Sequence, residues 1–392
     1  MEDAASLDRP HEVEVSVVIP CLNEAATIGA CIDAARLSLG QLQVNAEIVV
    51  ADNGSLDVSR EIAADRGARV VEVASRGYGN ALSAGIEASR GRYVIMGDGD
   101  GSYDFGGLAP FVEQLRAGND LVVGNRFAGG IHPEAMPWLH QHLGNPVLSL
   151  IGRKLFGTNC GDIYCGLRGF DRRKIIDLDI RSAGMEFAIE MIVKATVRNL
   201  NVTEVPTTLS PDAEGRKPHL RTWRDGWRSL RLLLLYSPRW LFLYPGIALL
   251  VAGLVGTVLL VPGQRTIGSV TFDVSTLLYA CLAVIVGLQS VYFFLSARWF
   301  AMNEGFLPED ERLRRLLGPN TLEIGLAVGV LLLVSGIGLS VYGVGRWNET
   351  GFGRLDYADI LRIVIPAATL IAVGLQTLLS SLFLSVLGLS RR

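Results

Sequence analysis

Two aspartates one residue apart follow an apolar stretch in the amino-terminal half of the chain. Asp98 and Asp100 alternate with glycines, which let the backbone come close to a ligand. Two carboxylates in a turn can face one hard cation, which prefers oxygen ligands and keeps positions open for phosphate oxygens. We therefore predict a Mg²⁺ or Mn²⁺ site at this turn, with an acidic surface turn as the alternative for so short a motif.

Further polar residues follow other apolar stretches. Asn23 and Glu24 come just after the first stretch, and Asp52 ends the second. A carboxylate at a strand end can accept a hydrogen bond from the imide N–H of a base, although the residues after Asp52 also suit a simple turn and helix cap. Arg76 precedes a glycine-rich turn that includes Gly79, and this combination at a helix start suits a diphosphate. Together these residues predict a nucleotide site.

These residues lie at the ends of alternating strands and helices. The predicted strands span 13–20, 47–52, 69–73 and 92–96, and the predicted helices span 24–37, 55–66 and 79–88. This order predicts a mostly parallel, Rossmann-like α/β sheet that helices cover on both faces. Ligands bind beyond the carboxyl ends of such strands, which is where Asn23, Asp52 and Asp98 fall.

Composition separates the chain into two parts. Of its 392 residues, 49% are hydrophobic, and the longest apolar runs come after residue 240. The net charge of −3 offers no overall basic surface for nucleic acid, and five cysteines without paired spacing favour a reducing compartment. Residues 1–12 are polar, which predicts a disordered start without a secretory signal. The catalytic part, residues 13–220, is therefore expected in the cytoplasm.

Residues 240–392 are expected to form a membrane domain. Four apolar stretches are long enough to cross a bilayer, at about 241–261, 274–297, 322–344 and 360–387. Arginines gather between the second and third stretches and after the fourth, and basic residues favour the cytoplasmic side. Residues 221–239 mix basic and aromatic side chains at helical spacing, which predicts an amphipathic helix at the membrane surface. These patterns indicate a multi-pass protein of the inner (plasma) membrane.

The motifs above, together with three later segments, resemble a known family. The later segments are 123–127, 162–170 and 185–187. As an ordered set over roughly residues 14–240, they resemble glycosyltransferase family 2 with its GT-A fold. The chain is similar to the polyprenyl-phosphate hexose synthase branch, which includes dolichyl-phosphate mannose synthases and bacterial undecaprenyl-phosphate glucosyltransferases. The implied fold class is an α/β GT-A catalytic domain followed by an α-helical transmembrane bundle.

The resemblance implies a role for each residue of the donor side. The residues expected to bind the nucleoside and diphosphate are Pro20, Asn23, Glu24, Asp52, Arg76 and Gly79. Asp98 and Asp100 would serve the donor sugar and the metal, with Asp100 catalytic. The family often has Gln or Asp where Ser102 stands, so the third metal ligand is Ser102, Asp104 or water.

An acceptor phosphate needs to be held rather than activated. A phosphate monoester is largely dianionic near pH 7, whereas a hydroxyl acceptor needs a general base. Arginine binds phosphate well because its planar fork is bidentate and permanently charged. The candidate acceptor residues are Arg126, Arg168, Arg216 and Lys217. Asp162 stands where relatives carry a catalytic carboxylate, and it orients the acceptor, acts as a base, or forms an internal ion pair with Arg168.

The predicted reaction is a metal-dependent, inverting transfer of a hexose to a polyprenyl phosphate on the cytoplasmic face, with Asp100, Arg126 and Asp162 as the catalytic residues. UDP-glucose is the favoured donor. The alternatives are a processive polysaccharide or glycolipid synthase that acts on a hydroxyl, and a non-catalytic membrane scaffold that binds a nucleotide sugar. Processive synthases carry a QxxRW element, of which only Arg239 and Trp240 are present here. A membrane and a lipid are expected partners, nucleic acid is not, and a homo-oligomer is compatible with this prediction.

Overall fold

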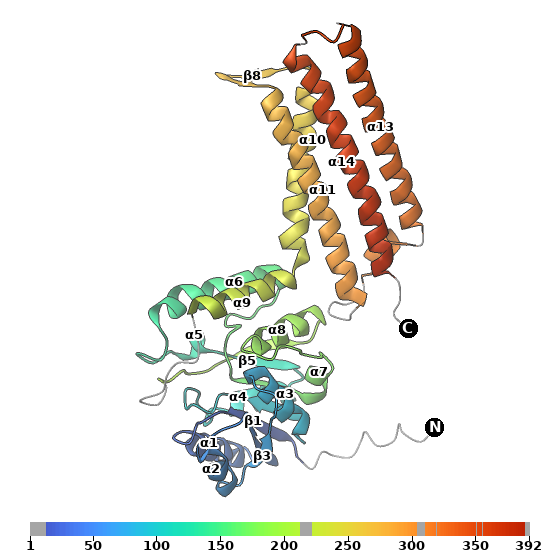
Figure 1. Cartoon of the computed structure of the whole chain (residues 1–392). Coiled ribbons are helices and arrows are strands. Elements are labelled where there is room, and N and C mark those ends of the chain that lie inside the picture. The colour runs from blue at the N-terminus through green and yellow to red at the C-terminus, as the bar shows by residue number, and fades with distance from the viewer. Residues whose placement is uncertain are drawn as a thin grey trace, which may run out of the picture. The chain divides into compact units, whose positions relative to one another are not determined.

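The computed structural model describes residues 13–211, 222–303, 310–318, 320–349, 351–354 and 356–388 (Figure 1). The predicted disordered segment 1–12 and the candidate acceptor residues Arg216 and Lys217 lie outside these ranges. The chain divides after Tyr236 into two compact units.

The first unit is built on a seven-stranded sheet with the strand order β3-β2-β1-β4-β6-β5-β7. The strands are β1 Val15–Cys21, β2 Ala46–Asp52, β3 Arg69–Glu72, β4 Tyr93–Met96, β5 Leu121–Asn125, β6 Arg168–Asp171 and β7 Val202–Pro206. All neighbouring strands run parallel except β6, which is antiparallel to both β4 and β5. The predicted mostly parallel sheet is thus confirmed.

The helices of this unit are α1 Ile28–Gln41, α2 Ser59–Asp65, α3 Tyr78–Ala88, α4 Ala109–Arg116, α5 Arg126–Gly129, α6 Asn145–Phe156, α7 Arg172–Ile176, α8 Phe187–Val197 and α9 Thr222–Leu235, with a π-helical turn η1 His140–Gly144 before α6. The helices α1 to α5 and α7 contact strands of the sheet, whereas α6, α8 and α9 pack on one another. Nearly every side chain of β1 and β4 is buried, as expected for strands with both faces covered.

The first two helices begin later than the sequence pattern predicts. α1 starts at Ile28 instead of residue 24, and α2 starts at Ser59 instead of residue 55. The residues ahead of each helix form loops that bond to each other: the Glu24 amide donates to the Ser59 hydroxyl at 2.8 Å, and the Leu56 amide donates to Asn23 Oδ1 at 2.8 Å. These contacts hold the residues ahead of each helix in loop conformations.

The strand register brings the predicted site residues to one edge of the sheet. Cys21 of β1 pairs with Asp52 of β2, and Val18 of β1 pairs with Met96 of β4. The carboxyl ends of all three strands therefore lie side by side. The loops that carry Asn23, Asp52 and Asp98 begin there, as the alternation of strands and helices predicts.

The second unit contains, within its described residues, four helices long and apolar enough to cross a membrane. They are Arg239–Leu260, which joins the π-helical turn η2 Arg239–Leu243 to α10 Tyr244–Leu260, then α11 Val274–Asn303, α13 Thr321–Glu349 and α14 Tyr357–Leu387. The strands β8 Arg265–Ile267 and β9 Val270–Phe272 form a hairpin between α10 and α11, and α12 Glu311–Leu316 precedes α13. The last three long helices extend beyond the predicted stretches, because polar turns continue each helix past its apolar middle.

Glycines let these helices approach closely in pairs. A Cβ added at Gly253 of α10 would lie 2.6 Å from a backbone carbonyl oxygen of α11, and a Cβ at Gly336 of α13 would lie 2.8 Å from a backbone carbonyl oxygen of α14. Small residues at such contacts are typical of membrane helix pairs. In contrast, α11 and α14 also contact each other through side chains, where the Tyr292 hydroxyl donates to the Thr377 hydroxyl at 3.0 Å.

Candidate active site

The turn after β4 holds both predicted metal-binding carboxylates. Asp100 Oδ1 accepts hydrogen bonds from the Ser102 amide at 3.0 Å and from the Ser102 hydroxyl at 2.6 Å. Asp98 Oδ1 accepts from the Tyr78 hydroxyl at 2.7 Å. The Thr27 hydroxyl, at the start of α1, donates to the Gly99 carbonyl at 2.7 Å and ties the turn to that helix. The turn is therefore fixed by its neighbours.

The Ser102 hydroxyl donates to Asp100 and orients that carboxylate. The third ligand, which is Ser102, Asp104 or water, stays a prediction. Within the described part of the chain, no group of three or more His, Cys, Asp or Glu side chains could hold a metal ion. The oxygens of Asp98 and Asp100 fit Mg²⁺ or Mn²⁺, and a bound donor or water would have to complete the coordination.

The loops after β1 and β2 form the neighbouring part of the edge. Asp52 is only 2% exposed, and its carboxylate accepts hydrogen bonds from the amides of Gly54 at 3.1 Å and Ser55 at 3.2 Å. Asn23 adopts a left-handed backbone conformation with φ of 60°, which asparagine tolerates. Its backbone amide donates to the Ser55 hydroxyl at 2.9 Å. The predicted nucleoside residues thus also hold the two loops together. Ser59 contributes to these loops although the sequence did not single it out, and Ser55, which was expected to cap a helix, lies in the loop ahead of α2.

The glycine-rich turn before α3 packs against a loop that follows α7. The Gly79 amide donates to the Ala183 carbonyl at 2.9 Å, and a Cβ at Gly79 would lie 2.0 Å from the Ser182 carbonyl oxygen. Gly79 was expected to approach a diphosphate. The close contact with residues 182–183 leaves no room for a side chain at Gly79, and its amide donates to Ala183. The approach of Gly79 to a diphosphate stays a prediction. Arg76, in the same turn, is exposed.

Glu190 of α8 holds that loop from inside the domain. It accepts hydrogen bonds from the Ser182 amide at 2.8 Å and the Tyr236 hydroxyl at 3.0 Å, and it pairs with Lys194 at 2.7 Å. Burial opposes ionisation of Glu190, but hydrogen bonds from Lys194 and Ser182 outweigh it and lower its pKa. The sequence reasoning missed this residue. An acidic and a basic residue four positions apart in an otherwise apolar helix were the available signal.

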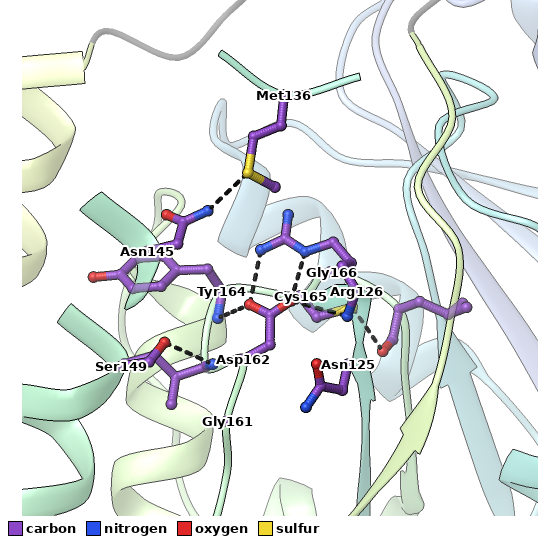
Figure 2. A network of polar contacts seen from close by, with 12 residues as sticks. Asn125, Arg126, Met136, Asn145, Ser149, Gly161, Asp162, Tyr164, Cys165 and Gly166 are labelled. Carbon is purple, nitrogen blue, oxygen red and sulfur yellow. Dashed lines mark hydrogen bonds and ion pairs between the residues drawn. The ribbon is translucent and has the colours of Figure 1, made fainter. Parts of the chain in front are cut away.

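The acceptor candidates Arg126 and Asp162 form a buried ion pair (Figure 2). Arg126 Nε donates to one carboxylate oxygen of Asp162 at 2.7 Å, and Nη2 donates to the other at 2.8 Å. The Arg126 amide adds a third bond to Asp162 at 3.2 Å. Burial lowers the pKa of Arg126, but Tyr103 and Asp162 outweigh burial and raise it. In Figure 2 the guanidinium lies between Asp162 and Met136.

The segment that carries Asp162 is itself held by β7. Glu204 accepts hydrogen bonds from the amides of Gly161 at 2.7 Å and Asp162 at 3.0 Å, and from the Asn125 side chain at 3.1 Å. Asn125 in turn precedes Arg126 at the end of β5. One carboxylate therefore fixes both members of the ion pair, and Glu204 is a second residue that sequence reasoning missed.

Arg168 differs from its predicted role. Of the alternatives for Asp162, the internal ion pair with Arg168 is wrong, because the partner of Asp162 is Arg126. Arg168 is fully buried, and its guanidinium donates to the carbonyl oxygens of Cys165 and Ile163, each at 2.8 Å, and to that of Ala188. Its nitrogens are engaged by the backbone. The geometry thus gives Arg168 a structural role in place of the predicted contact with an acceptor phosphate.

Sequence comparison matches both units of the chain. The family model described as glycosyl transferase family 2 matches residues 16–179, and the one described as the glycosyltransferase family 2 C-terminal transmembrane region matches residues 295–388. The solved structures that match include a glucosyl-3-phosphoglycerate synthase of Mycobacterium tuberculosis in complex with Mn²⁺ and uridine diphosphate. It matches over 57% of this chain and 80% of that chain, with 22% identity and a TM-score of 0.45.

Two relatives from Haloferax volcanii extend the comparison. The chain is 34% identical to the low-salt glycan biosynthesis hexosyltransferase Agl6, over 98% of this chain and 91% of the relative. It is 32% identical to a dolichyl-phosphate hexose transferase, over 49% of this chain and 81% of the relative. With this coverage and the ordered site residues, the chain belongs to glycosyltransferase family 2, as a glycosyltransferase with a GT-A domain and a carboxyl-terminal membrane region.

Proposed function

We propose that this glycosyltransferase moves a hexose from a nucleotide-diphosphate sugar to a polyprenyl phosphate and inverts the anomeric configuration. The names of two relatives, a hexosyltransferase and a dolichyl-phosphate hexose transferase, support a hexose and a lipid phosphate. UDP-glucose is the donor we favour. The observation that carries the proposal is that Asp162 is buried and paired with Arg126, because this bears on which nucleophile the enzyme can use.

Asp162 is poorly suited to act as a general base. Its carboxylate is fully buried and accepts three hydrogen bonds from Arg126 alone. A base must reach the proton that it removes, but both carboxylate oxygens of Asp162 are already occupied by the guanidinium of Arg126. A hydroxyl acceptor would need such a base, whereas a phosphate already carries negative charge. The ion pair therefore favours a phosphate acceptor, with Asp162 orienting Arg126.

On the donor side, the enzyme must bind the nucleotide and favour its departure. Asp52 and the loop around Asn23 would hold the nucleoside, and Arg76 would lie near the diphosphate. A divalent ion at Asp98 and Asp100 would neutralise negative charge that develops on the leaving diphosphate. The positive guanidinium of Arg126 would hold the attacking phosphate.

Two helices of the first unit support a membrane-bound acceptor. α6 and α9 pack against each other (Figure 1). Apolar side chains on them are exposed, with Leu150 of α6 at 43% and Trp227 of α9 at 61%, and exposed basic residues Arg153 and Lys154 lie in the last turn of α6. A surface that combines aromatic, aliphatic and basic side chains suits the headgroup region. We propose that this surface lies on the cytoplasmic leaflet of the inner membrane.

The full-length enzyme, purified in detergent, should transfer labelled glucose from UDP-glucose to polyprenyl phosphate. Under the same conditions, the matching polyprenol should receive little or none. Product can be measured by thin-layer separation and mass spectrometry. Efficient transfer to the free alcohol, or chain extension to a polysaccharide, would contradict the phosphate-acceptor proposal and leave only the family assignment.

Cysteine labelling tests the proposed orientation. All five native cysteines are buried, so a new exposed cysteine should give the main signal. Glu311→Cys lies on the arginine-rich side, where Glu311 is 84% exposed, and should react with an impermeant maleimide only after cells are opened. Ser269→Cys, in the exposed turn between β8 and β9, is the matched control and should react in intact cells. If Glu311→Cys reacted in intact cells and Ser269→Cys reacted only after cells are opened, the topology would be the reverse of the proposed one.

A further inference from the structure

The side chain of Tyr78 connects the glycine-rich turn to the carboxylate turn. Its hydroxyl donates to Asp98 Oδ1 at 2.7 Å. A phenol keeps its proton near neutral pH, so it can donate to a carboxylate, and such charge-assisted hydrogen bonds are stronger than neutral ones. Through this hydrogen bond, Tyr78 joins the glycine-rich turn, which is expected to approach the diphosphate, to the carboxylate turn, which is expected to bind the metal.

The backbone on either side of Tyr78 is fixed. The Gly77 amide donates to Asn53 Oδ1 at 2.7 Å, and the Gly79 amide donates to the Ala183 carbonyl at 2.9 Å. Gly77 has a φ of 138°, and a Cβ there would lie 2.3 Å from the Ala183 carbonyl oxygen. A turn held at both sides gives the phenol one direction. The bond from Gly77 also connects this turn to Asn53, which is next to Asp52, the carboxylate expected to bind the nucleoside.

Asp98 is confined on its other side as well. A Cβ at Gly166 would lie 2.8 Å from Asp98 Oδ2, so no larger residue fits there without moving the carboxylate. Gly166 is in turn fixed, because its amide donates to the Tyr103 hydroxyl at 2.7 Å. The carboxylate of Asp98 thus lies between the Tyr78 hydroxyl and Gly166.

We propose that Tyr78 is a positioning residue that holds Asp98 in the orientation needed to bind the metal and the donor diphosphate. This inference rests on the proposed function of the Asp98 turn. A tyrosine that only filled space would need its ring, whereas the proposed role needs its hydroxyl. Replacement by phenylalanine separates the two, because the ring remains and the donor is lost.

The test compares Tyr78→Phe with the parent enzyme in nucleotide and metal binding. Calorimetry measures the Kd of UDP, and of GDP in parallel, with Mn²⁺ and with EDTA. For the diphosphate that the parent binds, we expect the Kd in Mn²⁺ to rise about tenfold, the size expected when one hydrogen bond to a charged group is lost. The Kd in EDTA should be nearly unchanged. The Mn²⁺ concentration for half-maximal activity should rise by a similar factor.

Tyr93→Phe provides a matched control. Tyr93 is a buried tyrosine at the opposite end of β4, where it pairs with Val15 and Asp171. This variant should leave Mn²⁺-dependent binding unchanged. A double-mutant cycle with Asp98→Ala adds a second readout: if Tyr78 acts through Asp98, Tyr78→Phe should change little in the Asp98→Ala background.

The possible outcomes separate this inference from the proposed function. Parent-like Mn²⁺ dependence in Tyr78→Phe, or effects that add fully in the cycle, would overturn the positioning role. A parent enzyme that binds neither diphosphate, or binds equally in EDTA, would overturn the proposed metal-dependent donor site itself. If Tyr78→Phe lowers the Tm far more than Tyr93→Phe does, Gly166→Ala tests the same carboxylate from its other side and should also weaken Mn²⁺-dependent binding.

Discussion

Asp100→Asn is expected to lower the rate of sugar transfer by about a hundredfold or more while the protein stays folded. An asparagine oxygen can still accept the hydrogen bonds that the Ser102 amide and hydroxyl donate to Asp100. The substitution removes the negative charge that a hard cation needs, and metal stabilisation of a leaving diphosphate contributes several kcal/mol. Each ~1.4 kcal/mol corresponds to a tenfold change in rate. The measurement is the initial rate of labelled product formation at saturating donor.

EDTA should reproduce the loss, and added Mn²⁺ should restore the parent but not the variant. Asp104→Asn is the matched comparison, because Asp104 is exposed in the same turn and its carboxylate accepts a hydrogen bond from the Gly106 amide at 2.7 Å. A small effect there would set Asp100 apart, and an equally large one would show that the loss is not specific to Asp100. Full turnover of the parent enzyme in EDTA would contradict the metal site.

Arg126→Lys is expected to reduce transfer by about a hundredfold although the positive charge is retained. The planar fork of Arg126 bonds to both carboxylate oxygens of Asp162, at 2.7 and 2.8 Å, and lysine cannot reproduce this geometry. The lysine variant would leave a buried carboxylate only partly satisfied and would misplace the charge that holds the acceptor. A buried pair that loses one partner costs about 3–5 kcal/mol, and part of this cost should be recovered by the lysine ammonium.

The loss should appear in acceptor saturation and in the transfer rate, with donor affinity nearly unchanged. Arg116→Lys is the control, because Arg116 forms the same bidentate contact with Glu14, at 2.7 and 2.8 Å, on an exposed surface where such pairs contribute little. An Arg126→Lys enzyme as active as the parent would contradict the acceptor mechanism.

The positions of the donor-side residues could be predicted because they depend on local pattern. Apolar runs that end at Asn23, Asp52 and Asp98 define three parallel strands, and parallel strands bring their carboxyl ends to one edge. The boundaries of α1 and α2 were less predictable, since the residues ahead of these helices are fixed by contacts between loops about thirty residues apart in the chain. The spacing of apolar residues in the sequence carries no information about such contacts.

The acceptor side could be predicted only in part. Arg126 and Asp162 were both singled out, but their mutual pairing depends on a contact between residues 36 positions apart. The side chain of Arg168 and the backbone amide of Gly79 donate to backbone carbonyl oxygens, and the residue type alone does not reveal this. Glu204 holds the backbone amides of Gly161 and Asp162, which are 43 and 42 positions away, so no local motif marks it. The spacing of Glu190 and Lys194 does not reveal that Glu190 also holds the Ser182 amide.

The paired glycines of the membrane helices have a consequence for how the chain enters the bilayer. Because α10 contacts α11 and α13 contacts α14 at backbone distance, each pair of consecutive helices can associate as soon as its second member is synthesised. The contacts between the pairs, such as that between Tyr292 and Thr377, can form afterwards. Biogenesis would then proceed through two helical hairpins, inserted one after the other. A bulky residue at Gly253 or Gly336 would disturb a helix pair before the whole bundle has formed. Its main effect would therefore be a smaller amount of protein in the membrane, and the activity of each inserted molecule would change less.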